Sequence, residues 1–285
     1  MRLDDLRPSD NVEDRRGESY GGGGFGGPRM VFGGGGLGLV AVIVLSLVFG
    51  VDPSQLLNGG GPMPQPQVRQ ESGPRGDDVA FEFTRRVIGS AEDVWAPLMR
   101  EHGNRFSPAT FTAYDYATPT GCGTGQSSAG PFYCPGDAHI YLDLSFFSEL
   151  DQRFGAPGQF ARAYVIAHEY GHHIQNLLGV MDRRGGPSRG SDSDSVRTEL
   201  QADCYAGVWA YHANRQFAIL QNGDVDGALR AASSVGDDTL QKEGQGYVVP
   251  DSFTHGSSAQ RVRWFQRGLD SGQVDACDTF SARAL

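Results

Sequence analysis

The chain has 285 residues, including 41 glycines and 15 prolines, and its formal net charge is −10 at pH 7. Lys242 is the only lysine and the arginines form no dense basic stripe, which argues against nucleic acid as a partner. Glycine and proline are concentrated before residue 77. The remainder, about two hundred residues of ordinary apolar content, is enough for one domain or two small ones, which excludes a wholly disordered chain.

The first part of the chain predicts a tail followed by a membrane segment. Residues 1–29 are polar and glycine-rich, as in disordered segments. Residues 30–51 carry no charge and end in the apolar run LGLVAVIVLSLVFGV, which predicts one transmembrane helix, since a bilayer needs about 20 residues. The glycine run at 33–36 leaves a buried core helix or a signal-peptide core as alternatives.

Arginine distribution predicts the orientation of this segment. Five arginines precede it, whereas the first ones after it are Arg69 and Arg75. Because positive charge marks the cytoplasmic side, we expect a single pass through the cytoplasmic membrane with the N-terminus inside. Residues 1–29 would then be a disordered cytoplasmic tail. The proline- and glycine-rich residues 52–77 then form a flexible spacer. The spacer leads to an extracytoplasmic domain over residues 78–285.

All four cysteines lie in this outer part, and none belongs to a C-x-x-C pair. An oxidising compartment and an even number favour two disulfides over a structural zinc site. Cys122 and Cys134 bracket a short Gly/Ser loop, which suits a local bridge. The remaining pair, Cys204 and Cys277, would join a helix to the C-terminal end. Buried free thiols are the alternative.

Strand patterns come first in the domain and helical patterns later, which predicts an α+β fold. Ser90 is expected to cap a helix over 91–101. Aromatic and β-branched stretches at 110–118 and 131–144 predict short strands. Further helices are expected at 159–178, 195–220, 224–235 and 257–269.

His168, Glu169 and His172 form the pattern H-E-x-x-H within the expected helix 159–178. Four residues apart, the two histidines project from one face and can share one zinc ion, while Glu169 faces the water that zinc activates. A helix with incidental polar residues is the alternative. It would leave three half-buried polar side chains unpaired, which is costly.

The next helix offers Glu199 and Asp203, also four residues apart on one face. Glu199 has the longer reach and is predicted to be the third zinc ligand. Asp203 is predicted to accept the N–H of a ligand histidine and so fix its tautomer. Two carboxylates on a solvated helix face are the alternative. His173 points about 100° away from His172 around the helix, which predicts a packing or hydrogen-bonding role.

The segments HEYGHH, ELQADCYAG and HGSSAQRVRWF together resemble the putative neutral zinc metallopeptidases, a bacterial membrane-anchored family of the glutamate-zincin type. The similarity covers roughly residues 78–280. It implies a zincin-like domain with a small N-terminal sheet, a mostly helical remainder, and an edge strand within 131–144 that holds extended peptide. It also implies zinc on His168, His172 and Glu199, catalysis by Glu169, and support of a histidine by Asp203.

The resemblance further implies a histidine and an arginine from the C-terminal part of the domain placed over the metal, and His255 and Arg261 match. Both would stabilise the negative oxygen of a tetrahedral intermediate. Ser257 or Ser258 could cap the helix that carries Arg261. A loop histidine and a surface arginine are the alternative.

The expected function is a membrane-anchored endopeptidase that holds one zinc ion and hydrolyses peptide bonds of a peptide or protein substrate through a zinc-activated water. One alternative is a non-catalytic, zinc-stabilised interaction module tethered to the membrane. Another is a zinc amidase acting on cell-wall peptides. Three protein ligands plus water is the catalytic arrangement, which favours an enzyme.

Overall fold

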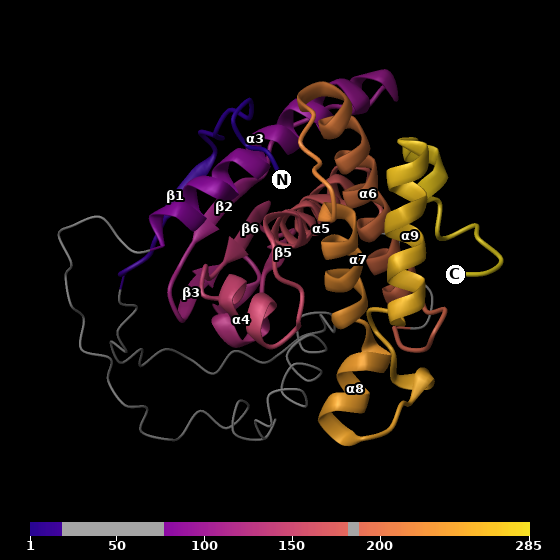
Figure 1. The fold of residues 1–285 in the computed structure, drawn as a ribbon. Coiled ribbons are helices and arrows are strands. Elements are labelled where there is room, and N and C mark those ends of the chain that lie inside the picture. The colour runs from indigo at the N-terminus through magenta and orange to yellow at the C-terminus, as the bar shows by residue number, and fades with distance from the viewer. Residues whose placement is uncertain (19–76, 182–187) are drawn as a thin grey trace, which may run out of the picture.

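The computed structural model describes residues 1–18, 77–181 and 188–285 and places a sheet beside a bundle of helices (Figure 1). The predicted transmembrane segment 30–51, and all of the predicted spacer 52–77 except its last residue, lie outside the described residues. Within the described ranges, no helix is both long enough and apolar enough to cross a bilayer.

The described residues contain seven α-helices besides the strands, as expected for an α+β chain. In chain order they are α3 (Asp78–Glu101), α4 (Phe146–Gln152), α5 (Gln159–Leu177), α6 (Asp194–Phe217), α7 (Asp224–Ser234), α8 (Asp237–Gln245) and α9 (Ser258–Ser271). Short 3-10 helices lie between these elements and near the C-terminal end, at Ser127–Ala129, Pro250–Ser252 and Val274–Cys277. The predicted helices at 159–178, 195–220, 224–235 and 257–269 are confirmed within a few residues, whereas α4 and α8 were not anticipated.

The main sheet has the strand order β1-β2-β6-β5. Its strands are β1 (Val12–Asp14), β2 (Thr110–Ala113), β6 (His139–Leu142) and β5 (Phe132–Cys134). β1, β2 and β6 run parallel, and β5 pairs antiparallel to β6. A separate hairpin joins β3 (Ala117–Thr120) to β4 (Gly123–Gln126). The predicted strand regions 110–118 and 131–144 are therefore confirmed.

Residues 1–18 belong to the fold, so the prediction of a disordered tail is wrong for them. Val12 of β1 pairs with Phe111 of β2, and Leu6 is only 2% exposed. Figure 1 shows this segment beside α3. Although the segment is polar, hydrogen bonds from its side chains hold it against α3. Ser9 Oγ and Asn11 Nδ2, for example, both donate to Glu92 Oε1, at 2.6 and 2.8 Å.

The first helix of the domain begins at Asp78, so the prediction that Ser90 caps it is wrong. Ser90 lies in the middle of α3, where its hydroxyl donates to the carbonyl of Val87 and accepts from Trp209 Nε1. Phe83 and Val87 are buried one turn apart, so the apolar face of the helix continues upstream of Ser90. A buried serine inside a helix was mistaken for a cap.

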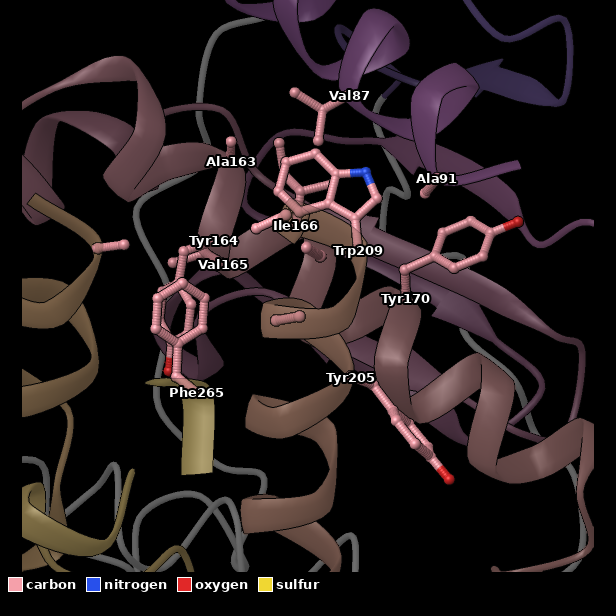
Figure 2. Packing of buried hydrophobic residues seen from close by; sticks show 14 of the residues in the cluster. Val87, Ala91, Ala163, Tyr164, Val165, Ile166, Tyr170, Tyr205, Trp209 and Phe265 are labelled. Carbon is pink, nitrogen blue, oxygen red and sulfur yellow. The ribbon is translucent and has the colours of Figure 1, made fainter. Parts of the chain in front are cut away.

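Trp209 of α6 is the centre of the core that aligns the helices. Figure 2 shows its indole among Val87 and Ala91 of α3 and Ala163 and Ile166 of α5. All five side chains are 2% exposed or less. This shared core fixes α5 and α6 relative to each other, and these are the two helices that carry the predicted metal ligands.

Helices α6 and α9 approach each other backbone to backbone. A Cβ placed on Gly268 would lie 2.0 Å from the carbonyl oxygen of Cys204, and one on Gly207 would lie 2.1 Å from that of Phe265. The Cys204–Cys277 disulfide ties the C-terminal part of the chain to the same region, and Cys122–Cys134 joins the β3–β4 turn to the last residue of β5. Both predicted disulfides are confirmed, and the described residues contain no free cysteine.

We expect Gly268→Ala to lower the free energy of unfolding by about 1–3 kcal/mol or more, because its new methyl group would force α9 away from α6. Gly227→Ala in α7 is the matched control. There a Cβ meets nothing closer than 3.7 Å, so the better helix former should be neutral or stabilising. Urea denaturation measures both variants. Equal stability of the two proteins would contradict the close approach.

Candidate metal centre and active site

Helix α5 presents His168, Glu169 and His172 from its buried part. Their exposed fractions are 7%, 8% and 9%. The two imidazoles lie one helical turn apart, with ring centroids separated by 4.7 Å. The helix therefore places both rings on one side, as the four-residue spacing predicts.

Glu199 of α6 completes this group. Its Oε2 lies 3.2 Å from His168 Nε2 and 3.6 Å from His172 Nε2. One ligand atom from each residue falls within 4.8 Å of the others. In a tetrahedral zinc site with bonds near 2.1 Å, neighbouring ligand atoms are about 3.4 Å apart. The donor set and its spacing therefore fit one zinc ion, as expected from the sequence.

The opposite nitrogen of each imidazole is engaged by the protein. His168 Nδ1 lies 2.8 Å from Asp203 Oδ1, and His172 Nδ1 lies 2.8 Å from Gln175 Oε1. With the proton donated from Nδ1 to these oxygens, Nε2 of each ring keeps its lone pair toward Glu199. Gln175 was not anticipated from the sequence, although its position three residues after His172 places it on the same face of α5.

Asp203 is fully buried and is paired with several donors, as its predicted supporting role requires. Tyr164 donates its hydroxyl proton to Oδ1 at 2.6 Å. Arg261 donates from Nε to Oδ2 at 2.8 Å and from Nη2 to Oδ1 at 2.9 Å. Burial alone would favour the neutral acid, but Arg261 and His168 hold the pKa of Asp203 at about 2. The carboxylate therefore stays charged at neutral pH.

Arg261 does not occupy the place expected for it. Its Nη2 is 3.4 Å from Nδ1 of His168, the edge of the ring that faces away from Glu199. The guanidinium lies behind the ligand histidine, and its hydrogen bonds go to Asp203 and Tyr164. The predicted role in stabilising an oxyanion is therefore wrong for Arg261. The resemblance to the family singled out Arg261, but it did not give the side of His168 that this side chain reaches.

His255 lies near enough to Glu199 for the charges of the two side chains to interact. Asp237 Oδ2 accepts the backbone N–H groups of Thr254, His255 and Gly256 at 2.7, 2.7 and 3.0 Å, which fixes this loop. Burial lowers the pKa of the imidazole, but Asp237 and the nearby charge of Glu199 raise it above its ordinary value. The side chain of His255 is 29% exposed and can contact a substrate. The role of Asp237 could not be predicted, because the residue lies in a polar sequence after Gly236 and belongs to no recognisable motif.

Other sequence-predicted features are found where they were expected. Ser257 caps α9 through a reciprocal pair of hydrogen bonds with Gln260. His173 is buried, donates toward the carbonyl of Ser107 and contacts the hydroxyl of Tyr133 in β5. The predicted hydrogen-bonding role of His173 is therefore confirmed. The contact with Tyr133 also holds β5 against α5, the helix that carries the H-E-x-x-H motif.

Within the described residues, two histidines and a glutamate therefore converge into a group that could hold one metal ion, and this is the kind of ligand set that zinc takes in proteins. The family described as "Putative neutral zinc metallopeptidase" matches residues 1–280, and the chain belongs to this family. The protein YpfJ of Escherichia coli strain K12 is 46% identical over 287 residues, which cover 98% of this chain and 99% of YpfJ. Rv2575 of Mycobacterium tuberculosis H37Rv is 46% identical over 69% of each chain. No solved structure matches.

We expect Arg261→Ala to lower the free energy of unfolding by about 3–5 kcal/mol, because it leaves the buried Asp203 charge without its main partner. Arg230→Ala, on the exposed side of α7, should change it by no more than about 0.5 kcal/mol. Chemical denaturation of both purified variants measures the difference. An Arg261→Ala protein as stable as the control would show that Asp203 does not depend on this arginine.

Proposed function

We propose that the protein is a zinc-dependent endopeptidase that cleaves peptide bonds by water attack. This proposal rests on one observation: His168, His172 and Glu199 converge, and hydrogen bonds at Nδ1 orient both imidazoles. A purely structural zinc site usually has four protein ligands. Within the described residues, only these three side chains form the group, which leaves room for water and a substrate carbonyl.

Bound zinc would supply Lewis acidity, which acidifies a water molecule and polarises the scissile carbonyl. Glu169 is the general base of the proposal. It takes the proton from the attacking water and passes it to the leaving amine. Burial raises the pKa of this carboxyl group above its ordinary value, which favours proton uptake. His255 donates a hydrogen bond to the developing oxyanion.

The position of β5 at the end of the main sheet supports peptide as the substrate class. Among the described strands, β5 pairs only with β6. An extended peptide adds to a sheet at an edge strand of this kind. Tyr133 holds β5 to α5, because its hydroxyl accepts a hydrogen bond from Asn176 Nδ2 at 2.8 Å. A substrate aligned along β5 would therefore run past the helix that carries His168, Glu169 and His172.

Two disulfides support an extracytoplasmic location, because such bridges persist in oxidising compartments. We propose that the uncharged segment 30–51 attaches the domain to the outer face of the cytoplasmic membrane.

We expect Glu169→Gln to keep one zinc per chain and lose peptide hydrolysis, whereas Glu199→Ala should lose the zinc itself. Of these two glutamates, only Glu199 is proposed to bind the metal. Metal analysis of the purified full chain and digestion of a peptide library give both readouts. Zinc in the wild-type protein without cleavage of any peptide would favour the non-catalytic module. Cleavage confined to cell-wall peptides or amides would favour the amidase.

We expect His255→Ala to retain zinc and lose about 10²- to 10³-fold in kcat, the usual cost of one oxyanion donor. His102→Ala is the control, since His102 follows the end of α3 and has no role in the proposed reaction. Steady-state kinetics on one peptide compares the two variants. Unchanged kcat in His255→Ala would remove this residue from the reaction.

A further inference from the structure

The N-terminal residues are bound to α3 by contacts that are specific to their side chains. Glu92, whose side chain is 6% exposed, accepts from Arg7 Nη2 at 2.8 Å as well as from Ser9 and Asn11. Arg7 also pairs with Asp93 at 2.8 Å. A buried carboxylate of the domain thus obtains its hydrogen-bond donors from the segment 1–18.

Helix α3 is also shaped to the backbone of this segment. Arg86 donates to the carbonyl of Leu6 at 2.7 Å, and Arg85 donates to that of Ser9 at 3.0 Å. The chain crosses α3 directly over Gly89. A Cβ on Gly89 would lie 2.3 Å from the carbonyl oxygen of Arg7, so only glycine permits this crossing. Further along, β1 covers the edge of β2 that is remote from β5.

Arg16 fixes the point where the segment meets the start of the domain. Its side chain is 3% exposed, pairs with Asp77 at 2.9 Å and Asp78 at 3.2 Å, and lies over the ring of Phe81 at 4.4 Å. Residues 16 and 77 are therefore neighbours in space. The chain leaves the domain and returns to it at one place.

This arrangement conflicts with a single membrane crossing. One crossing between residues 19 and 76 would put residues 1–18 and the domain on opposite sides of the bilayer, where they could not pair. The sequence 52–76 contains no second apolar run that could carry the chain back. The match to the family, moreover, begins at residue 1 rather than at residue 77.

We propose that residues 1–18 are an integral part of the domain that carries the proposed zinc site. They stay docked on β2 and α3 and lie on the same side of the membrane as the domain. The uncharged segment between them would then attach the protein from one side without carrying the chain across. This replaces the sequence-based expectation of an N-terminus in the cytoplasm and a domain outside.

Thiol labelling of the full-length chain in intact spheroplasts tests the sidedness. Asp10→Cys and Asp275→Cys introduce single thiols at side chains that are 99% and 89% exposed, one in the N-terminal segment and one in the domain. With a membrane-impermeant maleimide, we expect both variants to be labelled equally before lysis. Labelling of Asp275→Cys alone, with Asp10→Cys reached only after lysis, would overturn the proposal.

Gly89→Ala tests the docking independently of the membrane and of peptidase activity. In the purified full chain, we expect it to lower Tm and abolish hydrogen-exchange protection of the Val12–Asp14 amides. If residues 1–18 were undocked, the same change in a helix interior would leave Tm unchanged or raise it. Gly227→Ala is the control, and its Tm should be unchanged or higher than that of the wild-type chain. Unprotected Val12–Asp14 amides in the wild-type chain, or an undiminished Tm in Gly89→Ala, would contradict the docking.

Discussion

The structure depends most on the ionised carboxylate of Asp203, which is fully buried where α5, α6 and α9 meet. It accepts hydrogen bonds from Tyr164 and His168 of α5 and from Arg261 of α9. A buried charge of this kind is tolerated only while its partners stay in place. The three helices and the orientation of His168 are therefore energetically coupled. The close contacts at Gly207 and Gly268 bring α9 near enough for Arg261 to reach the carboxylate.

His172, the second histidine of the proposed metal site, is oriented by a chain of side-chain amides. Gln175 contacts His172 through Oε1 and donates from Nε2 to Gln201 Oε1 at 3.0 Å. Gln201 in turn donates to the carbonyl of Cys277 at 3.0 Å, beside the Cys204–Cys277 disulfide. Both imidazoles are thus held in one tautomer by groups that do not touch the metal, which is how supporting residues raise metal affinity. The disulfide contributes by holding the C-terminal end of this chain.

Helical spacing was sufficient to predict which side chains share one face of a helix: His168 with His172 on α5, and Glu199 with Asp203 on α6. It could not predict contacts between helices. The resemblance placed Arg261 over the metal, whereas the structure places it behind His168. Asp237 was missed because its partners are backbone N–H groups of a distant loop. Composition failed for residues 1–18, since their order comes from hydrogen bonds to Glu92 and from strand pairing rather than from apolar residues.

X-ray absorption at the zinc edge of the loaded, full-length protein tests the proposed centre most directly. Two imidazole ligands with only oxygen in the remaining positions is the result that His168, His172 and Glu199 predict. The disulfides leave no free cysteine among the described residues. A sulfur ligand, or a third or fourth imidazole, would therefore contradict the proposed site.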